Sequence, residues 1–250
     1  MKRYKAIVFD MFSTIAIWQP DRLPLFNWRG KTSHSTMGAL QESVAELLID
    51  VSFDVFVDAL DKANETLAAK RANEMKEFTS LERFELALHN AGYSSSIETR
   101  KLAQTLSLKH MDLLASAVEI PPAHVEFLSR LSAEYPVALL SNFDHGATVR
   151  RILDRDGAAS YLNPIIVSDE HGWRKPHEKI FADTLDDVGV AASEALYVGD
   201  SPEDDIVGAT NVGMDIAWVN ARDIALPAIG REPNFVVREI PELAKILLSE

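Results

Sequence analysis

A short apolar run that ends in an acidic residue is the feature that most constrains how this chain folds. Ala6–Phe9 is continuous, apolar and partly β-branched, and Asp10 follows it directly. Such a run is typical of a strand buried on both faces of a parallel sheet. Because an unpaired buried carboxylate is costly, we expect Asp10 at the carboxyl edge of that sheet, where open α/β sheets bind ligands. Taken alone, the stretch also fits an Asp that only caps a loop.

Further apolar runs alternate with helical periodicity in the second half of the chain. Strands are expected at 137–141, 165–167, 195–200, 216–219 and 235–237. Helices are expected before, between and after them, at 122–134, 145–154, 179–188, 204–212 and 241–248. Strands that alternate with helices predict right-handed βαβ units. The predicted fold class is therefore α/β, with a doubly wound parallel sheet.

The segment between the first strand and residue 117 has a different pattern. Residues 15–38 contain prolines, glycines and aromatic residues, which favour a loop. Residues 39–117 show helical spacing throughout, enough for about four helices and no strand, and Thr79 with Glu82 forms a capping-box signature. We therefore predict a core domain of residues 1–16 and 117–250, interrupted by a helical domain of residues 17–116.

Composition limits the possible partners and the compartment. The 250 residues carry a formal net charge of −13, so nucleic acid is not expected as a partner, and a small anionic substrate requires a local cluster of positive groups. The absence of cysteine excludes disulfides, thiolate metal sites and a cysteine nucleophile. No apolar run is long enough to span a bilayer, and no signal peptide is recognised. We expect a cytoplasmic monomer or homodimer without a membrane partner.

Three further stretches place polar groups near the ends of predicted strands. Ser141 and Asn142 follow a buried run and predict an anion site, although a helix N-cap is the alternative. Lys175, before Pro176, offers a point charge for a phosphoryl or carboxylate group, unless it is a solvated surface lysine. Clustered carboxylates after a buried strand are costly without a cation, so they predict a Mg²⁺ site rather than a solvated loop: Asp200, Glu203, Asp204 and Asp205.

In order along the chain, these stretches resemble the four motifs of the haloacid dehalogenase-like hydrolase superfamily. They are Asp10-x-x-x-Thr14, Ser141, Lys175 within Arg-Lys-Pro, and Gly199-Asp200-Ser201-x-x-x-Asp205-x-x-Gly208-Ala209. The helical insertion resembles the C1-type cap of subfamily I, so the resemblance covers essentially all of the chain. It implies a Rossmann-like core with an inserted helical cap domain.

The resemblance also implies roles for individual residues. Asp10 would be the nucleophile, forming a covalent intermediate that water hydrolyses, while Ser141 and Lys175 hold the anionic group. Mg²⁺ would be bound by Asp10, Asp200, the backbone carbonyl of Phe12 and, in a supporting position, Asp205.

Three more residues are predicted to contact the substrate. Thr14 supplies a hydroxyl beside the nucleophile, and Asn142 follows the predicted anion-binding serine. Arg29 lies in the segment that leaves directly from the nucleophile loop. For Arg29 the alternative is a solvated cation beside aromatic residues that only pack.

Phe12 departs from the phosphatase pattern of the superfamily. Its position normally holds a second Asp that protonates the leaving oxygen, whereas the 2-haloacid dehalogenase branch has an aromatic residue there. Asp200 favours the opposite assignment, since dehalogenases replace this metal-binding acid, and without a metal it would be a like-charge neighbour of Asp10. Ser13 also replaces a usual glycine. We predict Mg²⁺-dependent hydrolysis of a small phosphorylated metabolite; the alternatives are a metal-independent 2-haloacid dehalogenase and a non-catalytic protein that binds a phosphorylated ligand.

Overall fold

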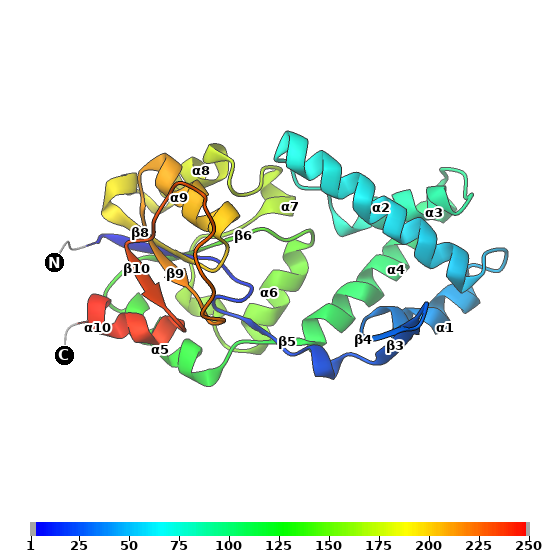
Figure 1. Cartoon of the computed structure of the whole chain (residues 1–250), viewed down its shortest axis with the longest axis horizontal. Coiled ribbons are helices and arrows are strands. Elements are labelled where there is room, and N and C mark those ends of the chain that lie inside the picture. The colour runs from blue at the N-terminus through cyan, green and yellow to red at the C-terminus, as the bar shows by residue number, and fades with distance from the viewer. Residues whose placement is uncertain (1–3, 249–250) are drawn as a thin grey trace. The chain divides into compact units, whose positions relative to one another are not determined.

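The computed structural model describes residues 4–248, which divide into two compact units (Figure 1). The α/β unit contains the described chain up to Trp18 and from Glu119 onward, and the helical unit is Gln19–Val118. Two short strands lie where the chain passes from one unit to the other: β2 (Ile17–Trp18) and β5 (Val118–Glu119).

One parallel sheet forms the centre of the α/β unit. Within residues 4–248 its six strands have the order β10-β9-β8-β1-β6-β7, and every neighbouring pair is parallel. The strands are β1 (Ala6–Phe9), β6 (Val137–Ser141), β7 (Ile165–Val167), β8 (Ala195–Gly199), β9 (Asp215–Val219) and β10 (Phe235–Val237). The predicted α/β class and the predicted strands are confirmed.

The register of the central strands brings their ends to one edge of the sheet. Phe9 of β1 pairs with Leu139 of β6 on one side and with Val198 of β8 on the other. The chain runs from β1 to β6 and β7 in one direction, and β8 to β10 extend the sheet in the other direction. The border between β1 and β8 is therefore a topological switch point, the place where open α/β sheets bind ligands.

Helices cover both faces of the sheet (Figure 1). One face carries α5 (Pro122–Ser132), α6 (Gly146–Arg155) and α10 (Ala244–Leu247), and the other carries α8 (Glu178–Val188) and α9 (Val207–Val212), while α7 (Ser168–His171) follows β7 directly. The core beneath α8 and α9 includes Val8, Leu140 and Tyr197 from three strands. Among the described helices, none combines the length and the apolar character needed to cross a membrane.

Gly208 allows α9 to pack closely against α8. A Cβ atom at this position would overlap the buried ring of Phe181 and lie 3.3 Å from the Cα atom of Pro176. We expect Gly208→Ala to lower the free energy of unfolding by about 1–3 kcal/mol, because a packed core has no space for the methyl group. Denaturant titration measures the change. Gly38→Ala, whose Cβ would meet nothing closer than 3.5 Å, is the control, and an equal effect of both substitutions would contradict this account.

The helical unit contains the four predicted helices and a hairpin. The helices are α1 (Met37–Leu47), α2 (Phe53–Glu74), α3 (Ser80–Asn90) and α4 (Ile97–Ser116), and they pack around Leu40, Phe56, Phe84 and Leu106. The predicted capping box begins α3, since the Glu82 N–H donates to Thr79 Oγ1 and the Thr79 N–H donates to Glu82 Oε2.

The prediction of a loop throughout residues 15–38 was wrong. β3 (Leu25–Trp28) and β4 (Lys31–His34) form an antiparallel hairpin with the two-residue turn Arg29-Gly30. Both turn residues have positive φ, 50° at Arg29 and 78° at Gly30, as the favoured hairpin turns require. The turn begins with arginine instead of the usual Asn-Gly or Gly-Gly pair, and β4 is polar at every position. The sequence therefore lacks the pattern that normally predicts a hairpin.

Candidate active site

Three carboxylates meet at the carboxyl edge of the central strands. Asp10 follows β1, Asp200 follows β8, and Asp205 lies in the π-helical turn η4 (Pro202–Ile206). One oxygen atom from each carboxylate lies within 4.8 Å of the others. The structure thus brings together Asp10, Asp200 and Asp205, while Glu203 and Asp204 of the predicted acidic cluster are not part of this group.

Lys175 supplies the positive charge within this cluster. Its Nζ donates to Asp10 Oδ1 at 2.6 Å, to Asp205 Oδ1 at 2.7 Å and to the Tyr197 hydroxyl at 2.9 Å. The side chain is 2% exposed. Because an ammonium group has three N–H donors, Lys175 is fully occupied and holds the nucleophile candidate in place.

The cluster contains more negative than positive charge. Burial raises the pKa of Asp10 to about 7 against the opposing charge of Lys175, and the charges of Asp205 and Asp200 add to the rise. Burial and the charge of Asp205 raise the pKa of Asp200 to about 6. Burial by itself lowers the pKa of Lys175, but the charges of Asp10 and Asp205 and their hydrogen bonds raise it above its ordinary value. Three carboxylates around one ammonium favour an added cation.

Two hydroxyl groups, one in the segment after β1 and one in the last residue of β6, lack hydrogen-bond partners among the described residues. Thr14 Oγ1 and Ser141 Oγ are both fully buried, and no partner lies within hydrogen-bond distance of either. A buried polar group left without a partner costs about 1–3 kcal/mol. The predicted contact of these two hydroxyls with the anionic part of a substrate stays a prediction.

Asn142 forms hydrogen bonds to Lys175 and Asp204. Its Nδ2 donates to the backbone carbonyl of Lys175 at 3.0 Å and to Asp204 Oδ2 at 3.1 Å, and its Oδ1 accepts the Lys175 N–H at 2.8 Å. These hydrogen bonds position the backbone of Lys175, and the predicted substrate contact of Asn142 stays a prediction.

Phe12 lies in a row of aromatic rings. Its ring centroid is 4.6 Å from that of Phe143 and 5.6 Å from that of Trp18. The position where phosphatases of the superfamily place a proton donor is thus part of an apolar surface. Phe12 and Ala16 form an isolated parallel bridge. In this bridge the Ala16 N–H donates to the Met11 carbonyl and the Ser13 N–H donates to the Ala16 carbonyl. Neither hydrogen bond uses the Phe12 carbonyl.

Two residues show the limits of prediction from the sequence. Arg29 lies in the helical unit, where its guanidinium is exposed and pairs with Asp58 at 2.6 Å, so its predicted substrate contact stays a prediction.

Tyr197 was not predicted as a site residue, although its hydroxyl donates to the Leu140 carbonyl and accepts a hydrogen bond from Lys175 Nζ. Its signal was a tyrosine within an otherwise apolar strand, since a buried phenol needs a partner.

Known proteins resemble this chain in sequence over about half its length. A family model described as haloacid dehalogenase-like hydrolase matches residues 56–219. Pyrimidine 5'-nucleotidase YjjG of Escherichia coli (strain K12) is 33% identical over 128 residues, which is 50% of this chain and 56% of that protein. Glyceraldehyde 3-phosphate phosphatase of Pyrococcus furiosus is 31% identical over 134 residues, 53% of this chain and 55% of that protein. The chain thus spans little more than half the length of these curated relatives.

A solved structure resembles the fold over nearly the whole chain. The 2-haloacid dehalogenase from Pseudomonas syringae pv. Tomato DC3000 aligns with a TM-score of 0.71 and covers 98% of both chains. The sequences are 22% identical in that alignment, so this likeness concerns the fold alone. The curated relatives with phosphatase names thus match part of the sequence, and a structural neighbour with a dehalogenase name shares the fold.

Proposed function

Since this chain belongs to the haloacid dehalogenase-like hydrolase family, we propose that it is a Mg²⁺-dependent phosphohydrolase that acts on a small phosphorylated metabolite. The observation that carries this proposal is the charge of the site: three convergent carboxylates, two with raised pKa values, face one lysine. Such a cluster at a buried edge fits a divalent cation better than a metal-free site.

The donor set fits Mg²⁺, which prefers oxygen ligands. Asp10 and Asp200 would bind the ion directly, with the carbonyl of Phe12 as a further ligand. Asp205 would orient the site, because its oxygen atoms already accept hydrogen bonds from Lys175 and from the Ser201 N–H. When bound, Mg²⁺ would offset the charge of the phosphoryl group and of the carboxylates around it.

Asp10 would attack the phosphorus atom with Oδ2, because Oδ1 is held by Lys175. A bond forms from this oxygen to phosphorus while the bond from phosphorus to the leaving oxygen breaks, giving an aspartyl phosphate. Thr14 and Ser141 would donate their hydroxyl hydrogens to the phosphoryl oxygens. Water then attacks the phosphorus, which releases phosphate and regenerates the Asp10 carboxylate.

The aromatic surface around Phe12 keeps a second candidate function open. Halide leaves without protonation, so a 2-haloacid dehalogenase has no need of a proton donor at this position. A screen of phosphate esters, acyl phosphates and 2-haloacids, each with Mg²⁺ and with EDTA, separates the candidates. The proposed function predicts phosphate release that EDTA abolishes. Halide release in EDTA would overturn it in favour of the dehalogenase, and no turnover would favour a protein that only binds its ligand.

We expect Asp200→Asn to weaken Mg²⁺ binding by at least about tenfold, because it removes one charged ligand from the site. Titration calorimetry with Mg²⁺ measures the change. Asp187→Asn, at an exposed position of α8, is the matched control and is expected to bind Mg²⁺ normally. Equal Mg²⁺ affinity in Asp200→Asn and unmodified protein would rule out Asp200 as a ligand.

A further inference from the structure

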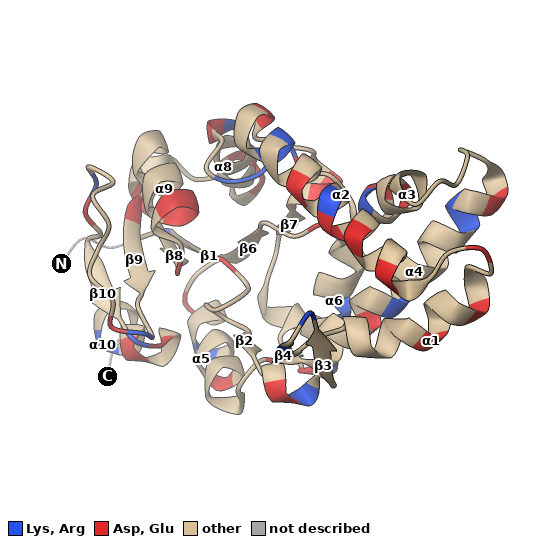
Figure 2. Ribbon diagram, turned by 45° about the vertical axis from the view of Figure 1, so that its right-hand side comes forward, with Lys and Arg blue, Asp and Glu red and all other residues tan. Residues whose placement is uncertain are grey.

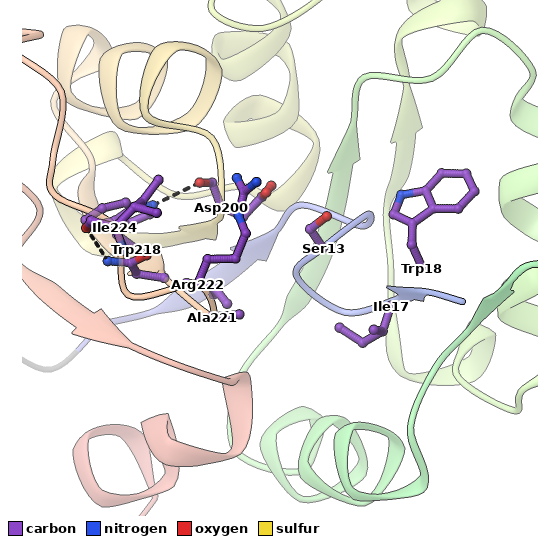
Figure 3. A pocket seen from close by; sticks show the side chains of 10 residues that line it. Ser13, Ile17, Trp18, Asp200, Trp218, Ala221, Arg222 and Ile224 are labelled. Atoms are coloured by element: carbon purple, nitrogen blue, oxygen red, sulfur yellow. Dashed lines mark hydrogen bonds between the residues drawn. The ribbon is translucent and has the colours of Figure 1, made fainter. Parts of the chain in front are cut away.

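A pocket of about 370 Å³ in the α/β unit opens beside Asp200 (Figure 3). One wall comes from the segment after β1, which contributes Ser13 and Trp18, and another comes from the loop after β9, which contributes Asn220 and Arg222. The volume is in the range of sites that bind small molecules. The pocket therefore adjoins the proposed reaction site and offers room for the rest of a substrate.

Arg222 is the cation of this pocket. Figure 3 shows its side chain extending from the loop toward Asp200, and its charge acts on that carboxylate. Among residues 4–248, however, no hydrogen bond or ion pair engages Arg222, whereas nearby Arg238 pairs with Asp223 at 2.8 Å. Asp and Glu residues lie on helices of both units (Figure 2), and the net charge of the chain is −13. An arginine that makes no hydrogen bond or ion pair in such a protein is available to an anionic ligand.

Two hydrogen bonds between Asn220 and Ile224 close the loop that carries Arg222. Asn220 Nδ2 donates to the Ile224 carbonyl at 2.9 Å, and Asn220 Oδ1 accepts the Ile224 N–H at 3.1 Å. Asn220 is itself buried, and Asp223 is held by its ion pair with Arg238. The backbone around Arg222 is therefore ordered before a ligand binds, which lowers the entropic cost of binding.

Ser13 places a hydroxyl group in the same pocket. Its φ is 61°, in the left-handed region where glycine is the unstrained residue and where this family usually has glycine. A serine therefore keeps its side chain here at a conformational cost. Figure 3 shows that side chain directed into the pocket between Trp18 and Asp200, where it offers a second hydrogen-bond donor.

We propose that this pocket binds the leaving-group portion of the substrate, and that this portion carries a second anionic group, a carboxylate or a phosphate, which pairs with Arg222. Ser13 contributes a hydrogen bond, and the half-buried indole of Trp18 lies against the apolar part of the ligand. The inference rests on the proposed function, since it assumes that the transferred phosphoryl group lies beside Asp10. It narrows the substrate class to phosphorylated acids or bisphosphates.

Two matched esters test this inference: phenyl phosphate and 4-carboxyphenyl phosphate, each with Mg²⁺. The unmodified protein is expected to prefer the carboxylated ester by about tenfold in kcat/KM, and Arg222→Gln is expected to reduce that preference to less than about twofold. Arg222→Lys should retain part of it. Ser13→Gly, which also relieves the positive φ, should reduce it by about threefold without loss of thermal stability. Arg130→Gln, an exposed arginine of α5 that lines a different pocket, is the control with the same charge change and should keep the full preference.

Binding to Asp10→Asn protein separates the failure of this inference from the failure of the proposed function. If neither ester releases phosphate, the proposed function fails, and calorimetric titration with both esters still tests the pocket. Tighter binding of 4-carboxyphenyl phosphate that is lost when Arg222→Gln is added supports the inference. Equal affinity for the two esters, or a preference that survives in Arg222→Gln, overturns it whether or not the protein is a phosphatase.

Discussion

Asp10→Asn protein is expected to fold normally and to lose at least about 10⁴-fold in kcat toward any accepted substrate, because a neutral amide cannot attack phosphorus or carbon. The substitution is nearly isosteric. Lys175 keeps its hydrogen bonds to Asp205 at 2.7 Å and to Tyr197 at 2.9 Å. One negative charge is removed from a buried cluster that holds a surplus of them, so thermal stability should stay equal or increase.

Turnover assays together with thermal unfolding measure the two halves of this prediction. Asp187→Asn, on α8 and outside the site, is the control and should retain full activity. Loss of activity with loss of folding would point to a structural role of Asp10 and leave the nucleophile unidentified. Full activity in the Asp10→Asn protein would remove Asp10 from the mechanism.

Turnover is expected to fall steeply as the basicity of the leaving group rises. Phe12 cannot donate a proton, and its neighbours Trp18 and Phe143 are aromatic. An alkoxide needs a proton in the transition state, whereas an aryl oxide or a carboxylate needs it far less. Acyl and aryl phosphates should therefore be cleaved, and alkyl phosphates should be poor substrates. A series of phosphate esters with graded leaving-group pKa measures the slope.

Phe12→Asp is expected to accelerate hydrolysis of alkyl phosphates by about 10²–10⁴-fold, and that of aryl phosphates much less, because it supplies the missing general acid. The rings of Trp18 and Phe143 should raise the pKa of the new carboxyl group, which favours the protonated form that a general acid requires. Phe12→Leu, which removes the ring without adding an acid, is the control and should not rescue alkyl esters. Similar rates on alkyl and aryl esters in the unmodified protein would show that another residue supplies the proton.

Much of the architecture was predictable because local patterns encode it. Apolar runs with polar residues at their ends identified the strands and placed Asp10, Ser141 and Asp200 near one sheet edge, since the carboxyl ends of parallel strands share an edge. The capping box at Thr79 similarly marked the start of α3. The hairpin of β3 and β4 was not predicted, because a polar strand lacks the usual periodicity and a turn that begins with Arg29 lacks the usual turn residues.

The sequence by itself thus determined the α/β class, the inserted helices and the residue types that gather at the sheet edge. Only the tertiary structure decided which of those residues contact one another. Lys175 meets Asp10 across 165 positions of the chain, and Asn142 meets Lys175 across 33. Arg222 reaches the neighbourhood of Asp200 because β9 pairs with β8. Hydrogen bonds and charge pairs at such separations depend on strand order and packing, which no local pattern of residues specifies.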